Sequence, residues 1–314
     1  MSFRLLAIGE AMAELRRSES DGFNVGFAGD TFNTAVYCAR ALDDLEPSDA
    51  SGKNSQAAQT VCYVTGVGHD PLSSAFVDLA KSENINTDHI ARHDNHNLGI
   101  YSVTTDNTGE RSFHYWRNSS AARQLFADET KAIELPAARV VYLSGISLAI
   151  MQPAARHRLI DHLKTLSESK QSLVAFDSNY RPQLWESREV AQAVISKMWD
   201  VADIALPSID DEMNLFGDSS EQVVVERFAA ANRMLTTIKR GSRGPVTPDL
   251  PSADYPKFEL AKKVVDTTAA GDSFNGGFLA AYLSGADQIK CMLAGHECAS
   301  QVVGVRGAIA PRTR

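Results

Sequence analysis

Short apolar runs rich in β-branched residues alternate with amphipathic segments along almost the whole sequence. The expected strands are residues 4–8, 60–65, 139–143, 172–176, 203–206 and 235–238. The expected helices between them include residues 31–42, 71–82, 153–167, 190–199 and 221–234. Strands joined by crossover helices run parallel, and helices then cover both faces of the sheet. The alternation therefore predicts an α/β fold with a mainly parallel central sheet and helices on both faces.

One stretch departs from this alternation. Residues 98–105 and 111–116 are two short strand-like runs, and Asp-Asn-Thr-Gly at 106–109 separates them, which predicts a β-hairpin. The hairpin belongs either to a small lid over the mouth of the main domain or to an antiparallel extension of the main sheet. Periodicity alone leaves both alternatives open. The polar residues 44–59, rich in Ser, Asp and Ala, predict a surface loop.

Composition limits the class of partner. The 314 residues carry a formal net charge of −8, whereas proteins that bind duplex nucleic acid usually present a basic face, so we expect no nucleic-acid partner. The chain has no run of about 20 apolar residues and no signal-peptide pattern, so we expect no membrane partner. The four cysteines form neither a CxxC pair nor a zinc-like cluster. We therefore expect buried thiols in a cytoplasmic protein.

Residues 264–278 carry the strongest chemical signal. Small residues at 269–271 let the backbone approach a ligand, and the sequence after them predicts a helix. The backbone N–H groups of Ala270, Gly271 and Asp272 would then meet at a helix N-terminus, which favours an anion. A carboxylate beside such a site suits a base that takes a proton from an attacking hydroxyl during phosphoryl transfer. The alternative role of Asp272 is a helix cap.

Two runs resemble signatures of one enzyme family. Asp-Thr-Thr-Ala-Ala-Gly-Asp at 266–272 closely resembles the C-terminal signature of the ribokinase-like, or PfkB, carbohydrate kinases. Ala-Gly-Asp-Thr-Phe-Asn-Thr-Ala at 28–35 resembles the sugar-binding turn of that family. Gly29 permits a tight turn there, and Asp30 and Asn33 can hydrogen-bond substrate hydroxyls. The absence of a GxxxxGK[ST] P-loop and of GxGxxG after a strand disfavours a P-loop ATPase and a dinucleotide oxidoreductase.

The family resemblance implies a nucleotide site for ATP. Lys-Arg-Gly-Ser-Arg-Gly at 239–244 resembles the family's nucleotide-binding turn, although by itself it predicts only a glycine turn with a solvated basic pair. The residues implied to contact ATP are Asn179, Lys239, Gly241, Gly244, Gly271, His296 and Ser300. For His296 taken alone, a structural role is the simpler interpretation.

The resemblance also implies metal ions. A Leu-Pro-Ser-Ile-Asp-Asp-Glu run is similar to the family's Asn-x-x-Glu motif, which organises the hydration shell of Mg²⁺. Ser208 stands where Asn is usual, and Asp211 where Glu is usual. Since Mg²⁺ keeps several waters in proteins, Asp211 could act through water, and the neighbouring Glu212 could share that role. A monovalent cation such as K⁺ is implied at Asp266 and Thr268.

The nature of the substrate depends on two arginines. Arg117 ends the predicted hairpin, and Arg181 follows the strand at 172–176. Open α/β sheets bind ligands at the carboxyl ends of their strands. A guanidinium suits a carboxylate better than a sugar hydroxyl, so the two arginines predict an acidic substrate. The alternatives are a solvated charge for Arg117 and an ion pair between Arg181 and Asp177.

Several strings resemble one branch of the family, the 2-keto-3-deoxygluconate kinases. They are residues 8–10, 28–34, 115–118, 144–150, 179–182, 266–274 and 306–309. The resemblance implies that ATP phosphorylates the 6-hydroxyl of this sugar acid, with Asp272 as the base. The substrate pocket would contain Gly29, Asp30, Asn33, Tyr101, Tyr115, Arg117 and Arg181. The rival functions are a kinase of a neutral sugar, such as fructose or ribose, and a non-catalytic sugar- or nucleotide-sensing module.

The same resemblance implies the organisation of the chain. We expect a single kinase domain over residues 1–314, with a small β lid from about 10–28 and 96–118. Strand edges in such a lid can pair with a second subunit, so we expect a homo-oligomer.

Overall fold

The computed structural model describes residues 2–18, 22–45, 60–105, 111–231 and 233–312. Its centre is an eight-stranded sheet in the order β12-β11-β10-β9-β1-β4-β5, with β6 also paired to β4. Every described pair in this sheet is parallel. Its strands are β1 (Phe3–Ile8), β4 (Val61–Val67), β5 (Ile85–Asn86), β6 (Ile90–Arg92), β9 (Ala138–Ser144), β10 (Leu173–Asp177), β11 (Ile204–Ala205) and β12 (Leu235–Thr236).

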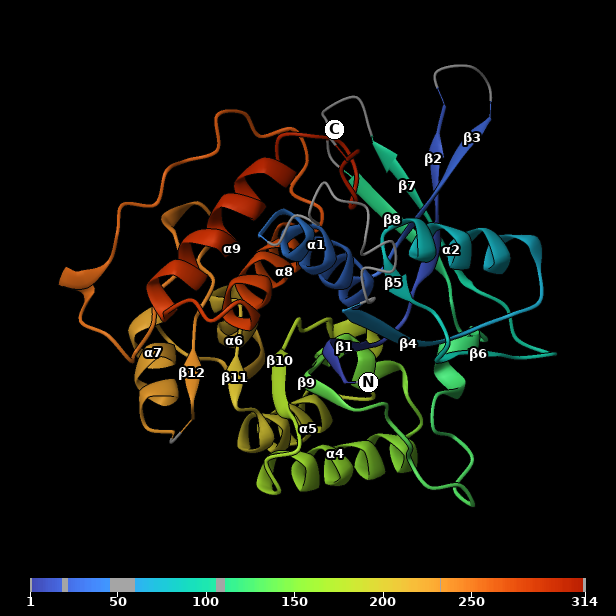
Figure 1. The fold of residues 1–314 in the computed structure, drawn as a ribbon, viewed down its shortest axis with the longest axis horizontal. Coiled ribbons are helices and arrows are strands. Elements are labelled where there is room, and N and C mark those ends of the chain that lie inside the picture. The colour runs from blue at the N-terminus through green and yellow to red at the C-terminus, as the bar shows by residue number, and fades with distance from the viewer. Residues whose placement is uncertain (1, 19–21, 46–59, 106–110, 232, 313–314) are drawn as a thin grey trace, which may run out of the picture.

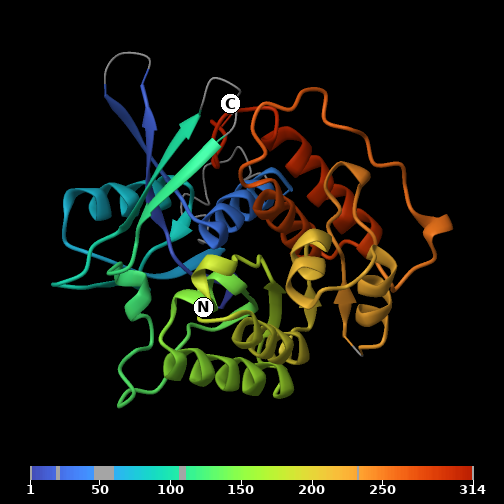
Figure 2. The same ribbon diagram turned by 180° about the vertical axis from the view of Figure 1, so that it is seen from behind.

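Helices cover both faces of the central sheet (Figure 1), which confirms the predicted fold class. One face carries α1 (Asp30–Leu45), α2 (Pro71–Ser82), α8 (Ala270–Leu283) and α9 (Gln288–Val302). The other carries α3 (Gly145–Ile150), α4 (Pro153–Glu168), α5 (Arg188–Val201), α6 (Ile209–Phe216) and α7 (Glu221–Ala229). The short 3-10 turns are η1 (Ala121–Gln124), η2 (Pro182–Leu184), η3 (Gly241–Arg243) and η4 (Ser252–Asp254). Seen from behind, the same two layers enclose the sheet (Figure 2).

Local sequence signals explain where several helices begin and end. Asp70 precedes α2 and accepts a hydrogen bond from the Ser73 amide at 3.0 Å, while Pro71 occupies the first helical turn. Ser187 caps α5 in the same way. Helix α6 ends at Gly217, whose φ of 76° lies in the left-handed region that glycine adopts easily. Of the loops next to these three ends, the one before α5 reaches the larger cavity described below, through Arg181, Gln183 and Leu184.

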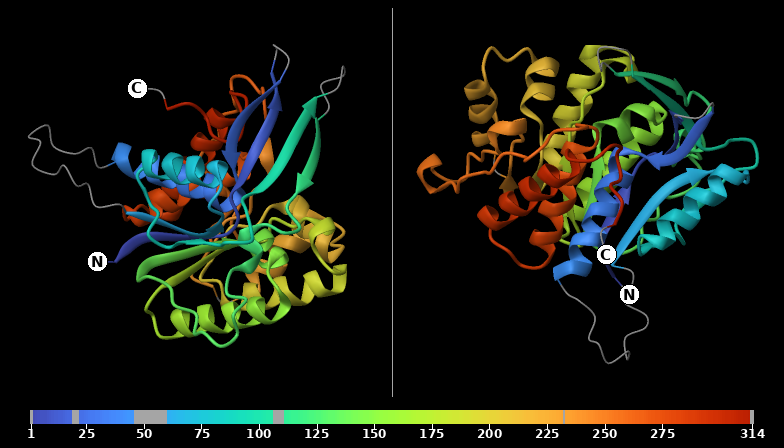
Figure 3. Two further views of the ribbon diagram at one scale, coloured as in Figure 1. Left: turned by 90° about the vertical axis from the view of Figure 1, so that its right-hand side faces the viewer. Right: turned by 90° about the horizontal axis from the view of Figure 1, so that it is seen from above.

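The predicted hairpin belongs to a second, smaller sheet. Its order is β3-β2-β7-β8, from β2 (Met12–Arg17), β3 (Phe23–Ala28), β7 (Gly99–Thr105) and β8 (Arg111–Trp116). Strands β2 and β7 run parallel, and the other two pairs are antiparallel. Figure 3 shows this sheet standing beside the helical layers rather than extending the central sheet. The lid alternative is therefore confirmed; the turn residues 106–109 lie outside the described residues, as do 46–59 of the predicted surface loop.

Helix α8 lies tightly between α1 and α9. A Cβ added to Gly276 would lie 2.8 Å from the Thr34 carbonyl oxygen of α1. A Cβ added to Gly277 would lie 2.7 Å from the Ala294 carbonyl oxygen of α9. Only glycine fits at these two contacts, so the three helices approach as closely as their backbones allow.

No helix within the described part of the chain is long and apolar enough to cross a lipid bilayer.

Candidate active site

Two cavities meet at the first turn of α8. One, of about 1070 Å³, lies between the small sheet and the carboxyl ends of the central strands. The other, of about 600 Å³, lies between α9 and the chain that follows β12. Residues lining both cavities are Ser208, Thr267, Ala270 and Gly271. A molecule in each cavity would therefore meet its neighbour at the N-terminus of α8.

The backbone at this junction is shaped for a close approach. Ala269 precedes α8 with a φ of 61°, in the left-handed region, and its methyl side chain cannot cap the helix. The amide of Ala270 donates to the Thr267 carbonyl at 3.2 Å, so one of the three predicted amide donors is already used in a turn. Gly271 and Asp272 follow in the first helical turn, where N–H groups have no partner within the helix. An anion at this position would meet unpaired donors and the positive end of the helix dipole.

Asp272 does not cap α8. Its Oδ2 instead accepts a hydrogen bond of 2.8 Å from Nδ2 of Asn33, so the carboxylate faces the larger cavity. Burial raises the pKa of Asp272 to about 7, and the nearby Asp30 carboxylate contributes to the increase. A carboxyl group that is close to half ionised near neutral pH suits proton transfer, whereas a structural cap needs no such pKa.

The turn before α1 brings the other carboxylate into place. A Cβ on Gly29 would lie 2.1 Å from the Glu10 carbonyl oxygen, so glycine is required there. Asp30, which begins α1, accepts hydrogen bonds from the Ser144 hydroxyl and, at 3.0 Å, from Nδ2 of Asn179. Asn179, expected among the nucleotide contacts, lines the larger cavity. It holds Asp30 beside Asp272.

Both predicted arginines line the larger cavity, but in different surroundings. Arg117 is 6% exposed and forms an ion pair with Glu10, which also accepts from Ser120. Arg181 is about half exposed. Its Nη1 donates to the Tyr180 carbonyl at 2.8 Å and contacts Asp211 at 3.2 Å.

These contacts correct both structural alternatives for the arginines. Arg117 is not a solvated charge, since its guanidinium is buried. Arg181 pairs with Asp211 rather than with Asp177, whose carboxylate accepts instead from Lys239.

Aromatic side chains from the small sheet form one wall of the larger cavity. The Tyr115 ring lies 5.8 Å from that of Tyr101 and 6.4 Å from that of Phe113. The two tyrosines were predicted from the sequence, whereas Phe113 was not. Alternation along β8 could have identified it, because residues 113 and 115 share one face of the strand.

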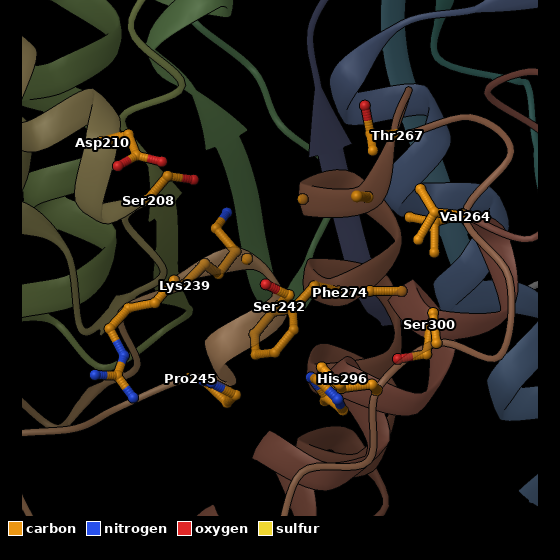
Figure 4. Close-up of a pocket in the computed structure, with 18 residues that line it drawn as sticks. Ser208, Asp210, Lys239, Ser242, Pro245, Val264, Thr267, Phe274, His296 and Ser300 are labelled. Atoms are coloured by element: carbon orange, nitrogen blue, oxygen red, sulfur yellow. The ribbon is translucent and has the colours of Figure 1, made fainter.

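The smaller cavity is mainly apolar (Figure 4). His296 and Ser300 of α9 line it, as predicted, and Nε2 of His296 lies 2.7 Å from the Glu259 carbonyl oxygen. Lys239 and Gly241 line it too. Gly244, which was also expected to contact ATP, does not line it, and a Cβ added there would meet the Phe258 ring instead. An apolar slot with a few polar groups suits a flat heterocyclic base.

The residues expected to hold metal ions lie in different surroundings. Asp211 lines the larger cavity, whereas Glu212 is fully buried and bonded to Arg227 at 3.0 Å, and burial raises its pKa to about 7. Glu212 therefore cannot share the role of Asp211, which corrects that expectation. Asp266 accepts from the amides of Thr268 and Gly307, at 2.8 and 2.9 Å. Among the described residues, no three His, Cys, Asp or Glu side chains form a direct metal cluster.

Comparison with known proteins gives a consistent result. The chain is 40% identical to the 2-dehydro-3-deoxygluconokinase of Escherichia coli K12 over 322 residues, covering 99% of this chain and 98% of that protein. It is 37% identical to the corresponding Haemophilus influenzae protein, covering 98% and 95%.

Solved structures agree in fold. The 2-dehydro-3-deoxygluconokinase of Thermotoga maritima superposes with a TM-score of 0.76 at 22% identity, covering 98% of this chain and 96% of that one. A Vibrio cholerae fructokinase with bound fructose, ADP and potassium gives a TM-score of 0.77 at 21% identity, covering 98% and 94%. The family model for the pfkB family carbohydrate kinases matches residues 2–314. This chain belongs to the pfkB family of carbohydrate kinases.

Proposed function

We propose that this protein is a 2-dehydro-3-deoxygluconokinase. It transfers the γ-phosphoryl group of ATP to the 6-hydroxyl of 2-dehydro-3-deoxy-D-gluconate, the sugar acid also called 2-keto-3-deoxygluconate, and releases ADP. The observation that carries the proposal is that Arg117 and Arg181 line the same cavity as Asp272. Relatives at 37–40% identity over nearly their full length carry the same activity in their names.

The acceptor hydroxyl lies beside Asp272 in this mechanism. The carboxylate takes the hydroxyl proton as the oxygen attacks the γ-phosphorus, and Asn33 holds the carboxylate in position through its 2.8 Å hydrogen bond. The first-turn amides of Gly271 and Asp272 stabilise the charge on the phosphoryl oxygens. The two arginines hold the far end of the substrate, so the 6-hydroxyl is the group that reaches the base.

Arg117 has capacity for a substrate carboxylate although it already pairs with Glu10. Its Nε is buried and has no hydrogen-bond partner among the described residues. A buried donor without a partner costs free energy, and a substrate oxygen would remove that cost. Its guanidinium also lies 5.9 Å from the Tyr115 ring, which fixes its orientation.

Metal ions fit this arrangement in a limited way. Asp211 is one of several carboxylates that line the larger cavity, and it suits Mg²⁺ held through water, since Mg²⁺ retains most of its hydration shell. When bound, Mg²⁺ would neutralise charge on the ATP phosphates. Asp266 and Thr268 would hold a monovalent cation such as K⁺ beside the turn that precedes α8.

The chain would act as one kinase domain over residues 1–314, with the β3-β2-β7-β8 sheet as its lid. The lid places its aromatic wall over the substrate and excludes water from the phosphoryl group, which limits ATP hydrolysis. A homo-oligomer formed through lid edges is part of the proposal.

The test measures ADP release with Mg·ATP and 2-keto-3-deoxygluconate, fructose or ribose in parallel. We expect strong preference for the acid. Arg117→Ala and Arg181→Ala should each lower kcat/KM for the acid by about 10- to 100-fold, because each removes a charged hydrogen bond of about 1.5–3 kcal/mol. The same two substitutions should lower kcat/KM for a neutral sugar far less.

Two controls make this experiment decisive. Arg117→Ala leaves Glu10 fully buried without its partner. Arg181→Ala leaves the more exposed Asp211 without its partner, so it tests the pocket at a smaller cost in stability. Arg312→Ala removes an exposed arginine that pairs with Asp43 and should leave both activities unchanged. Wild-type preference for a neutral sugar would reject the acid substrate, and absence of turnover with every sugar would reject the kinase activity.

A further inference from the structure

Lys239 is a buried lysine at the junction of the two cavities. The residue is 7% exposed, and its Nζ donates to Oδ2 of Asp177 and, at 3.0 Å, to Oδ1 of Asn275. The backbone of Lys239 is fixed as well, since its amide donates to the Pro207 carbonyl at 2.8 Å and it forms a parallel bridge with Ser208. Both ends of this side chain are therefore held by the protein.

Within the described part of the chain, the ammonium group retains one donor beyond these two bonds. A lysine has three N–H donors, and the contacts with Asp177 and Asn275 use two of them. Nζ lies 3.7 Å from the position that a Cβ on Gly271 would occupy, next to the first turn of α8. Figure 4 shows the amino group pointing into the space between Ser208 and the helix that carries Phe274. The remaining N–H is thus near the place where the two cavities meet.

We propose that Lys239 is a catalytic residue that donates this N–H to the phosphoryl group during its transfer. The inference rests on the proposed kinase function and adds to it a cationic group acting on the moving phosphoryl. The new bond joins the acceptor oxygen to the γ-phosphorus, the bond to the β,γ-bridging oxygen breaks, and the hydroxyl proton passes to Asp272. Lys239 forms and breaks no covalent bond and keeps its protons.

The surroundings of Lys239 favour action on the transferring group over binding of ATP alone. Asp177 and Asn275 hold the ammonium in place, so its position does not depend on whether a nucleotide is bound. Asn275 is itself fixed by hydrogen bonds to Asp177 at 2.7 Å and to Tyr142 at 3.0 Å. A donor fixed where charge develops stabilises the transition state without reorganisation of the site.

The competing explanation is that Lys239 only compensates the buried charge of Asp177. Lys239→Met alone would not separate the two explanations, since it leaves that carboxylate buried and unpaired and can unfold the chain. The double variant Lys239→Met/Asp177→Asn removes the ion pair as a whole. Lys164→Met removes an exposed lysine of α4 and serves as the control.

The experiment compares the double variant, Asp177→Asn and the control by melting temperature and steady-state kinetics. We expect the double variant to fold, to keep KM for ATP and for the acceptor within about 3-fold, and to lose about 10²-fold in kcat, the usual cost of one transition-state donor. Asp177→Asn should lose far less than the double variant. Near-normal kcat in the double variant would show that Lys239 is only a counter-ion and would overturn the proposal.

A binding measurement separates this role from simple nucleotide binding. Calorimetry with Mg·ADP alone and with Mg·ADP plus aluminium fluoride, which mimics the transferring phosphoryl group, should show an affinity loss of about 10²-fold in the double variant only for the fluoride complex. Equal losses for both ligands would overturn the proposal. Wild-type kinetics test the acceptor independently, because failure to phosphorylate the sugar acid would reject the proposed substrate. The calorimetric comparison of Mg·ADP with and without aluminium fluoride would still decide the role of Lys239.

Discussion

Replacing Asp272 by Asn should slow the enzyme and stabilise the protein at the same time. Asn cannot accept the acceptor proton, so kcat should decrease by about 10²- to 10⁴-fold, the usual contribution of a positioned general base. In the wild type, kcat should decrease as the pH falls through about 7, because the pKa of Asp272 is about 7 and only the ionised carboxylate acts as a base.

The gain in stability follows from the same pKa. The folded protein holds the Asp272 proton more tightly than the unfolded chain, whose aspartates have a pKa near 3.8. Ionising this carboxyl group in the fold therefore costs free energy, and the cost grows as the pH rises from about 4 to 7. With about 1.4 kcal/mol per pKa unit, the cost reaches at most about 4 kcal/mol above pH 7. Asp272→Asn should recover part of it at pH 8.

The change in melting temperature is large enough to measure. An unfolding entropy of about 2.1 cal/mol/K per residue over 314 residues makes each kcal/mol worth about 1.5 °C. A gain of 2 kcal/mol would thus raise the melting temperature at pH 8 by about 3 °C, whereas at pH 5 the wild-type carboxyl is already protonated and the difference should be small. Asp161→Asn, an exposed change on α4, is the control. A variant that melts below the wild type at pH 8, or that keeps normal turnover, would refute the reasoning.

Two further substitutions test the packing and the nucleotide site. Gly276→Ala should destabilise the protein by about 1–3 kcal/mol, because the new methyl group would lie 2.8 Å from the Thr34 carbonyl oxygen; an unchanged midpoint in chemical denaturation would contradict this. His296→Ala should raise KM for ATP about 5-fold. The substitution removes the hydrogen bond to the Glu259 carbonyl, which orders the pocket and contributes about 1 kcal/mol. The KM for the acceptor should stay constant, so parallel increases in both KM values would contradict the assignment of this cavity to ATP.

Sequence patterns predicted most of the fold because the apolar residues of each central strand or helix recur with one clear period. The expected helix at 71–82 coincides with α2, and the strand at 172–176 lies within one residue of β10 at each end. Prediction was weaker at the edge of the sheet. The expected strand at 235–238 is reduced to β12, and beyond it the pairing continues as isolated bridges, with Ile238 bridged to Val246 and Lys239 bridged to Ser208. A pairing with a residue later in the chain leaves no local period to detect.

At the site, continuous motifs predicted functional residues, whereas contacts between residues far apart in the sequence could not be predicted. The run that ends at Asp272 identified the first turn of α8. No spacing indicates that Lys239 pairs with Asp177, 62 residues earlier, because the fold alone brings them together. The exclusion of Glu212 was accessible from sequence, since Asp211 and Glu212 are consecutive on a helix and point about 100° apart, so only one can face the cavity.

The glycine contacts that hold α8 between α1 and α9 also bear on how this protein can evolve. Natural variation at Gly276 or Gly277 is opposed by backbone atoms of neighbouring helices, so the helix that presents Asp272 has few tolerated sequences. The strands of the lid meet no such restriction at Phe113 and Tyr115, whose side chains are partly exposed. Selection for a new acceptor can therefore act on the lid while the phosphate chemistry is inherited unchanged. Among descendants of this sequence, the lid residues that contact the acceptor should therefore change faster than the residues of α8.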